Sequence, residues 1–327
     1  MRTKWKYLST YRNILFFIAM FSIYVFHYFE NTLLDKKISI LGIYYYKLIG
    51  SDGVEIFLIL SAMGLCFSWN KNQDLFRFYK RRIKRIVPTY FLVGGLAWII
   101  IDFLLLHRPN LILPDFFFIT FFTKGTRLFW FVLFIIIMYF LFPMLHKWLS
   151  WNNKYRRYNF VLLLLVSILV NWILQHFYPI LYMNVSVAVR RLTVFILGIY
   201  YGEKVYYDID VSFIDVLVII AGLILKISTL FFTLPHIPMY IVDAFFTIPL
   251  IFCLILLIQQ IRQDKILNFF SYLGILSFEL YLFNVALRQI FSLMGYKPSV
   301  LVNYILLSFL AIILSVITHD LIKWSLK

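Results

Sequence analysis

Acidic residues are scarce in this chain. Its 327 residues include 15 Asp and Glu against 31 Lys and Arg, and charged residues of both signs make up only 14% of the sequence, whereas 63% is hydrophobic. So little polar sequence cannot cover the surface of a soluble core. The composition therefore argues against an ordinary soluble domain and indicates an all-α polytopic membrane protein.

Cysteine is almost absent as well. Cys66 and Cys253 both fall inside apolar segments and show no metal-ligand spacing, which argues against a disulfide framework and a zinc site. We expect both to be packing residues and expect no metal. A net charge of +16 would suggest nucleic acid in a soluble protein, but here the cations concentrate in short segments between apolar runs, so we expect no nucleic-acid partner.

Long apolar runs fill most of the remaining sequence. Ten of them are long enough for a hydrocarbon core of about 30 Å, which predicts about ten transmembrane helices in a single membrane-embedded domain, residues 1–327. They lie near 13–29, 54–69, 87–106, 128–146, 159–178, 192–207, 213–232, 240–258, 270–292 and 300–320. No small-residue cleavage site follows the first run, so we expect a retained helix and not a signal peptide.

The distribution of the cations predicts the topology. If the N-terminus is cytoplasmic, 20 of the 31 Lys and Arg fall on the cytoplasmic side and about half as many on the other. The positive-inside rule then places both termini in the cytoplasm of a multi-pass cell-membrane protein. The outer loop 107–127 contains PDFFFITFF, which is too short to span a bilayer and is expected to be interfacial or re-entrant.

One run of cations has no acid in it. Between Arg77 and Arg85 lie six Lys or Arg, pinned between two apolar segments. Such a run can be a topology anchor that binds anionic lipid, at about 1 kcal/mol per cation near the surface. Alternatively, Arg81, Arg82 and Arg85 fall at i, i+1 and i+4 near the start of a helix, where grouped guanidinium groups suit phosphates. The residues alone leave both interpretations open.

Polar residues inside the apolar runs each cost a few kcal/mol and therefore need a reason. Those in question are His27, Glu55, Arg190, Arg191, Asp243, Glu279, Asn284 and Arg288. His27 lies 15 positions after Arg12, which places the two about 60° apart around a helix and about 22 Å apart along it, on one face at opposite ends of the bilayer. A neutral imidazole there could take a proton from an alcohol that attacks a carbonyl, or it could simply form a hydrogen bond at the interface.

The order of several motifs resembles a known family. Arg12 and His27 in the first span are followed by GVEIFLILSAMG, YKRRIKRIVP, LFWFVLFIIIMYFLFPML, RRLTVFILGIYYG and LSFELYLFN. In this order they resemble the acyltransferase type 3 family of integral-membrane acyltransferases over nearly the whole chain. The resemblance implies an enzyme with ten helices that transfers an acyl group, most often acetyl or succinyl, from cytoplasmic acyl-CoA to a hydroxyl of a cell-envelope carbohydrate or a related lipid-linked acceptor.

The resemblance also implies roles for individual residues. His27 would be the general base and Glu55 would orient the imidazole or the acceptor. The phosphates of acyl-CoA would lie against Arg81, Arg82 and Arg85, with Arg12 also on the donor side. The residues implied for the acceptor are Arg190 or Arg191, Ser61 and Asn284.

Three positions depart from the family pattern. The separation of Arg12 and His27 is about one turn longer than in the family. The Ser-Gly-Phe motif reads Ser61-Ala62-Met63, and the histidine expected in the ninth span is replaced by Asn284. Asn284 keeps open an inactive family member that assists polysaccharide export. A transporter or flippase for a lipid-linked sugar also stays open, in which the same polar residues would line a pathway and the basic run would bind a diphosphate.

Overall fold

The computed structural model describes residues 5–50, 52–232 and 237–325. The protein is 83% helical and contains no strands in the part described. The first half consists of α1 (Tyr7–Thr10), α2 (Arg12–Leu34), α3 (Ile40–Leu48), α4 (Asp52–Lys71), α5 (Leu75–Trp98), the π-helix η1 (Ile99–Leu105), the 3₁₀-helix η2 (Pro109–Leu111), α6 (Ile112–Phe116), α7 (Ile119–Lys124) and α8 (Trp130–Leu149). The second half consists of α9 (Arg156–Phe177), α10 (Pro179–Val189), α11 (Leu192–Tyr206), α12 (Phe213–Ser228), α13 (Met239–Gln260), α14 (Asp264–Ile275), α15 (Ser277–Leu293) and α16 (Leu301–Ser325).

The predicted number of transmembrane helices agrees roughly with this architecture. Among the described residues, eight helical runs are long and apolar enough to cross a membrane, and α14 with α15 makes a ninth if the pair is one span. These two helices meet at a bend of 64°, inside the predicted span 270–292. The span predicted at 213–232 corresponds to α12, which has 16 residues.

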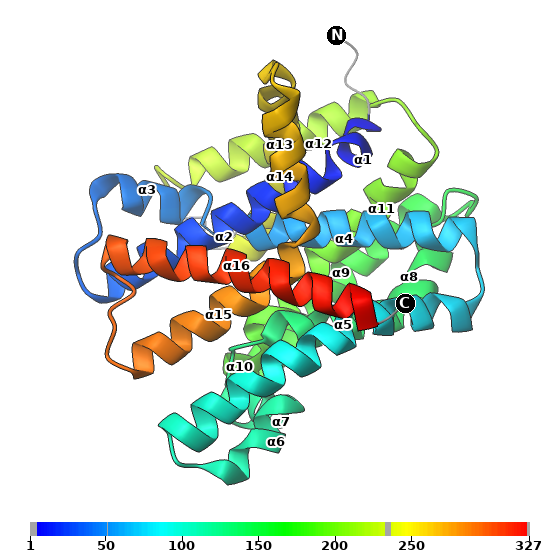
Figure 1. Ribbon diagram of the computed structural model, residues 1–327. Helices are drawn as coiled ribbons and strands as arrows, with labels where there is room; N and C mark the ends of the chain where they lie inside the picture. Colours follow the sequence, from blue (N-terminus) through cyan, green and yellow to red (C-terminus); the bar gives the residue numbers. More distant parts are fainter. Residues whose placement is uncertain (1–4, 51, 233–236, 326–327) are drawn as a thin grey trace.

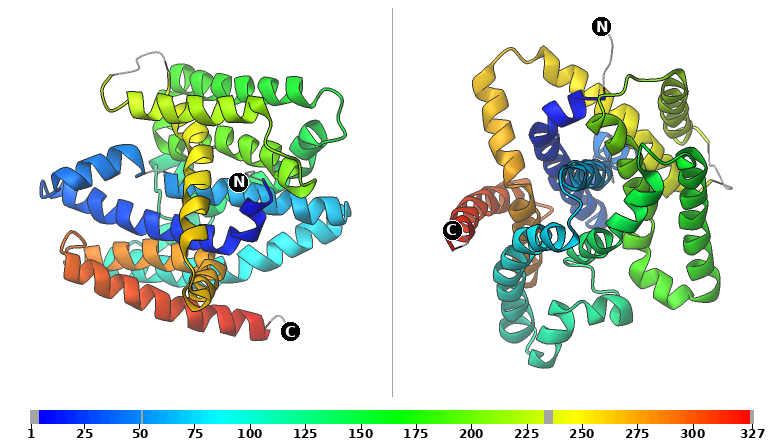
Figure 2. Two further views of the ribbon diagram at one scale, coloured as in Figure 1. Left: turned by 90° about the horizontal axis from the view of Figure 1, so that it is seen from above. Right: turned by 90° about the vertical axis from the view of Figure 1, so that its right-hand side faces the viewer.

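Helix α2 is the element around which its neighbours are arranged. It packs against α4, α14, α15 and α16. In Figure 1 the axes of α2, α15 and α16 are roughly aligned, whereas α14 crosses them. Arg12 at the start of α2 and Lys323 near the end of α16 line the same cavity. The start of the first membrane helix and the end of the last one therefore lie on the same side of the molecule, which agrees with the topology expected from the sequence (Figure 2).

Helices α4 and α11 pack closely against each other. A Cβ atom built on Gly198 would lie 2.7 Å from the Cβ of Ala62 and 2.9 Å from the Cα of Ile59, so only glycine fits there. Small residues at such crossings let membrane helices approach closely. Ala62 thus takes the place of the family's glycine because the partner helix leaves room for its methyl group.

Helix α5 begins earlier than the predicted span 87–106. Asp74 caps its N-terminus by accepting a hydrogen bond from the backbone N–H of Arg77 at 3.0 Å. The basic run therefore occupies the first three turns of a continuous helix, and its cations take helical spacing. The PDFFFITFF segment forms parts of the short helices α6 and α7, separated by Phe118 in a left-handed conformation (φ 61°), and neither helix could span a bilayer.

A buried ion cluster joins three helices and was not predicted. Lys226 of α12 lies 2.5 Å from a carboxylate oxygen of Asp243 in α13 and 3.8 Å from one of Asp52 in α4. Asp52 is 0% exposed and Lys226 is 2% exposed. Because an unpaired charge is costly inside a membrane protein, this cluster fixes the mutual positions of α4, α12 and α13.

Candidate functional site

A basic cavity of about 440 Å³ opens where the start of α2, the middle of α5 and the bend between α14 and α15 meet the end of α16. Four cationic side chains line it: Arg12, Lys84, Arg85 and Lys323. None of the four forms an ion pair with a carboxylate among the described residues. The acid in the lining, Glu279, is paired with His319 at 3.1 Å. The cavity therefore offers unneutralised positive charge, as a site for a polyanion does.

Arg12 is held in place by packing. Its guanidinium lies 5.0 Å from the centre of the Phe16 ring, at cation–π distance. On its other side, a Cβ atom on Gly64 would come within 2.5 Å of a terminal guanidinium nitrogen. The glycine in α4 thus makes the space that Arg12 occupies.

Only part of the basic run lines this cavity. Arg85 lines it, whereas Arg81 is exposed and lies outside the lining. Arg82 packs toward α8, with its guanidinium 5.3 Å from the ring centre of Phe78 and 5.7 Å from that of Tyr139. The structure therefore brings together Arg12 and Arg85 of the four predicted donor-site residues and adds two lysines that sequence reasoning missed.

A second cavity, of about 270 Å³, lies farther along α2. Its polar lining consists of His27, Glu30, Arg127, Arg191 and Arg288. Nδ1 of His27 lies 2.9 Å from Oε2 of Glu30, which also accepts a hydrogen bond from Nη1 of Arg288 at 3.2 Å. If Nδ1 carries the proton that Glu30 accepts, the lone pair of Nε2 is available as a base.

Glu55 has another partner than the one expected. One of its oxygens lies 3.4 Å from Nε of Arg191, and Glu55 does not line the cavity. The carboxylate beside the imidazole is Glu30. The contacts thus pair Glu30, and not Glu55, with the imidazole, and a role of Glu55 toward the acceptor stays a prediction. Glu55 holds Arg191, which lies over the Trp130 ring at 5.4 Å.

Of the remaining residues expected on the acceptor side, one lines the histidine cavity and three do not. Arg190 is exposed and donates to the hydroxyl of Tyr182 at 3.1 Å, so Arg191 alone of this pair reaches the cavity. Ser61 is half-buried in α4 and lines neither cavity. Asn284 is 7% exposed and lines neither cavity; its side chain lies against the hydroxyls of Tyr24 and Tyr304.

The two cavities follow one face of α2. Arg12 and Phe16 line the basic cavity, and Met20, Ile23 and His27 line the histidine cavity. These positions recur at intervals of three or four residues, which is the spacing of a single helical face. The structure thus places a cation site and an imidazole site at the two ends of one face, as the spacing of Arg12 and His27 predicts.

The histidine cavity contains two groups that sequence reasoning missed. Glu30 follows His27 by three residues on the same helix, a spacing that brings side chains together and could have revealed the pair. Arg127 lies just before α8 in the loop that carries α6 and α7, and no local pattern connects it with α2. Its position depends on how that loop folds back over the helices.

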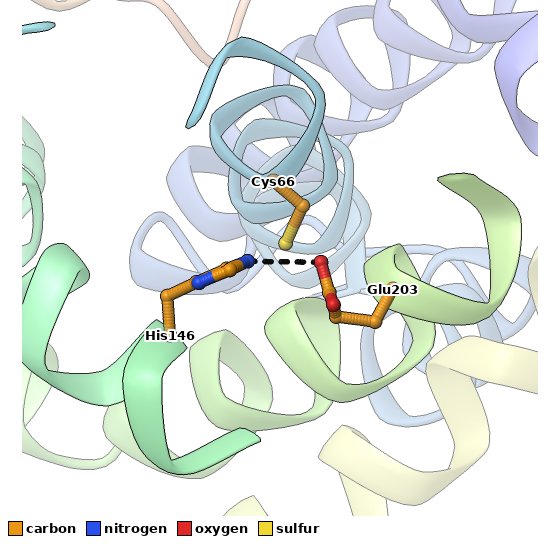
Figure 3. A group of neighbouring side chains, drawn as sticks. All are labelled: Cys66, His146 and Glu203. Carbon is orange, nitrogen blue, oxygen red and sulfur yellow. Dashed lines mark hydrogen bonds and ion pairs between the residues drawn. The ribbon is translucent and has the colours of Figure 1, made fainter. Parts of the chain in front are cut away.

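A buried cluster of Cys66, His146 and Glu203 has the side-chain types of a metal site (Figure 3). Both carboxylate oxygens of Glu203 already accept hydrogen bonds: Oε1 from Nδ2 of Asn70 at 2.7 Å and from His146 at 2.9 Å, and Oε2 from the backbone N–H of Trp151 at 2.9 Å. The cluster joins three segments that the topology expected from the sequence would place on the cytoplasmic side. We interpret it as a structural network that anchors the ends of α4, α8 and α11.

Comparison with known protein families finds a match over nearly the whole chain. The family model for an acyltransferase domain, that of the type 3 acyltransferases, matches residues 13–320. The chain belongs to the acyltransferase type 3 family. It is therefore a multi-pass membrane acyltransferase whose transferred group is not an aminoacyl group. No curated protein and no solved structure matches the chain.

Proposed function

We propose that this protein transfers an acyl group, acetyl or succinyl, from acyl-CoA bound at the basic cavity to a hydroxyl of a cell-envelope carbohydrate or lipid-linked acceptor at the histidine cavity. The observation that carries the proposal is the pair of cavities on one face of α2, with unpaired cations in one and the His27–Glu30 pair in the other. Acyl-CoA fits this arrangement, because its polyanionic head matches the cations of the basic cavity and its narrow, neutral thioester arm can extend toward His27.

The donor head would lie in the basic cavity. Arg12 and Arg85 would contact phosphate oxygens through guanidinium groups that can form two parallel hydrogen bonds, and Lys84 and Lys323 would add charge. The arm would extend along α2 toward His27, which lies about 22 Å farther along the helix axis. By the positive-inside rule the basic cavity is cytoplasmic, where acyl-CoA is found.

The chemical step then takes place at His27. Nε2 accepts the proton of the acceptor hydroxyl as its oxygen attacks the thioester carbonyl. The C–S bond breaks, an ester C–O bond forms, and the proton passes from the imidazolium to the CoA thiolate that leaves. Glu30 holds the ring and stabilises the imidazolium, and the guanidinium groups of Arg191 and Arg288 are placed to stabilise the charge that develops on the carbonyl oxygen.

The position of Asn284 bears on whether the protein is active. It lies outside both cavities and contacts two tyrosine hydroxyls. An amide can make such hydrogen bonds as well as an imidazole can. The substitution of the family's histidine thus leaves the proposed base and its carboxylate in place, which supports an active enzyme over an inactive assistant of polysaccharide export.

The experiment that tests this function uses protein purified into liposomes with acyl-CoA labelled in its acyl group. An acyltransferase forms a labelled ester on added envelope carbohydrate or lipid-linked sugar, at a rate proportional to the amount of protein. A flippase instead moves a labelled lipid-linked sugar across the bilayer without consuming acyl-CoA. Translocation with no loss of thioester would support the flippase and contradict the proposal.

A further inference from the structure

Four aromatic rings separate the two cavities. Phe16 of α2 contacts Phe57 of α4 with ring centres 4.7 Å apart, Phe57 contacts Phe131 of α8 at 5.4 Å, and Phe131 contacts Tyr281 of α15 at 5.2 Å. All four side chains are between 3% and 8% exposed. They form a continuous layer across four helices, which we call the aromatic layer.

Two helices independently place this layer at the boundary. On α2, Phe16 lines the basic cavity, and the next residue on that face, Met20, lines the histidine cavity. On α15, Phe278 lines the basic cavity and Tyr281 the histidine cavity. The change from one cavity to the other therefore falls at the same level on both helices, where the rings of Phe16 and Phe57 meet.

We propose that the aromatic layer selects the acyl group by its length, with Phe16 and Phe57 as the determining residues. This inference rests on the proposed function, because a thioester arm that runs from Arg12 to His27 has to part these two rings. Phe57 also forms part of the wall of the histidine cavity, where the acyl group comes to lie. Its ring thus limits both the passage and the space beyond it.

The size of the histidine cavity indicates which acyl groups fit. A cavity of about 150 Å³ holds one benzene molecule, and the histidine cavity measures about 270 Å³. Once a sugar ring occupies part of it, the remaining space admits an acyl group of a few carbons. Acetyl and succinyl fit, whereas a medium-length chain such as octanoyl meets the ring of Phe57.

The test compares acetyl-CoA and octanoyl-CoA as donors for the wild type, Phe57→Ala and Phe16→Ala. The readout is the ratio of octanoyl to acetyl transfer within one preparation, which does not depend on how much of the protein is folded. We expect Phe57→Ala to raise this ratio at least 10-fold and Phe16→Ala to raise it less. Phe17→Ala is the matched control, since Phe17 stacks on Phe270 away from both cavities and should leave the ratio unchanged.

Phe57→Leu keeps an apolar side chain of intermediate size, so it provides a second readout if Phe57→Ala does not fold. A ratio of octanoyl to acetyl transfer above that of the wild type, but raised less than expected for Phe57→Ala, supports the inference. An unchanged ratio in the variants of both phenylalanines, with acetyl transfer preserved, would overturn the inference and leave the proposed function standing. A wild-type protein that transfers from neither donor would instead overturn the proposed function, and the length selection with it.

Discussion

Glu30 lies one turn after His27 on α2, with its Oε2 2.9 Å from Nδ1 of the imidazole and 3.2 Å from Nη1 of Arg288. In the proposed reaction this contact gives the two ring nitrogens different roles: Nδ1 donates to Glu30, and Nε2 accepts the proton of the acceptor hydroxyl. It also connects α2 with α15, because Arg288 comes from the helix that packs beside it. The site is thus assembled from one local pair and one long-range contact.

Removing the Glu30 carboxylate should slow the chemical step. Glu30→Gln keeps the shape of the side chain but loses the charge that stabilises the imidazolium, so we expect kcat to fall 10²-fold or more, within the range of general acid–base catalysis. The KM for acyl-CoA should change little, because the donor head binds at the other end of α2. Steady-state kinetics with labelled acyl-CoA would check both values. A raised KM with normal kcat would place Glu30 in substrate binding instead.

Charge removal in the basic cavity should weaken donor binding. Loss of one charge-assisted contact in Arg85→Ala or Arg12→Ala should cost about 1.5–3 kcal/mol, or about 10- to 100-fold in affinity for acyl-CoA. Arg85→Lys should recover only part of this, since an ammonium group cannot form two parallel hydrogen bonds with a phosphate. Binding of acyl-CoA to detergent-solubilised protein at fixed salt would measure the difference.

The matched control for that series is Arg77→Ala. Arg77 belongs to the same basic run and helix but pairs with Asp74 at 3.4 Å and lies outside the cavity. If the run acts only as an anchor for anionic lipid, Arg77→Ala and Arg85→Ala remove the same charge and should have equal effects. Equal affinities would therefore remove the basis for a phosphate site at Arg85.

The buried ion cluster should dominate the stability of the α4, α12 and α13 region. Lys226→Met removes the cation and leaves Asp52, which is 0% exposed, without compensation. Breaking a buried pair in this way costs about 3–5 kcal/mol. The triple variant Lys226→Met with Asp52→Asn and Asp243→Asn should recover much of this loss, because neither carboxylate that contacts Lys226 then keeps its charge. Thermal unfolding in detergent would compare the variants, and equal stability of Lys226→Met and the wild type would show that the cluster contributes little.

The topology can be checked with single cysteines. Cys66 and Cys253 can be replaced first, and new cysteines introduced in 36–50 and 71–77. A membrane-impermeant reagent added to intact cells should label the first segment and not the second, because the cation-rich segment is expected in the cytoplasm. External labelling in 71–77 would invert the orientation and place the basic cavity where acyl-CoA does not occur.

Much of the helix architecture could be predicted from the sequence, because each membrane span is a long apolar run that can be recognised from its own residues. The helical face shared by Arg12 and His27 followed from their spacing alone. Sequence reasoning could not choose between Arg190 and Arg191, because both lie at the junction between α10 and α11, and only the way this junction packs decides which side chain reaches the cavity. That the whole chain forms a single domain remains a prediction.

The contacts between distant segments were out of reach of the sequence. Lys323 lies near Arg12 only because α16 packs beside α2, and Lys226 meets Asp52 only because α13 packs against both α4 and α12. Such pairs depend on which helix faces pack together. Because the apolar faces of different helices have similar sequences, the sequence of one helix does not predict which face of another it contacts. The same reason explains why the sequence could not distinguish Glu55 from Glu30 as the partner of His27: the contact of Glu55 with Arg191 joins α4 to the start of α11.

In the proposed mechanism, His27 takes the proton of the acceptor hydroxyl. The most direct measurement is acyl transfer by His27→Gln and His27→Ala in liposomes, with acyl-CoA binding measured on the same preparations. Glutamine keeps a hydrogen-bonding side chain but cannot accept and release the proton at this step. We predict that both variants bind acyl-CoA like the wild type and lose transfer by at least 10²-fold. Full transfer by His27→Gln would contradict the account.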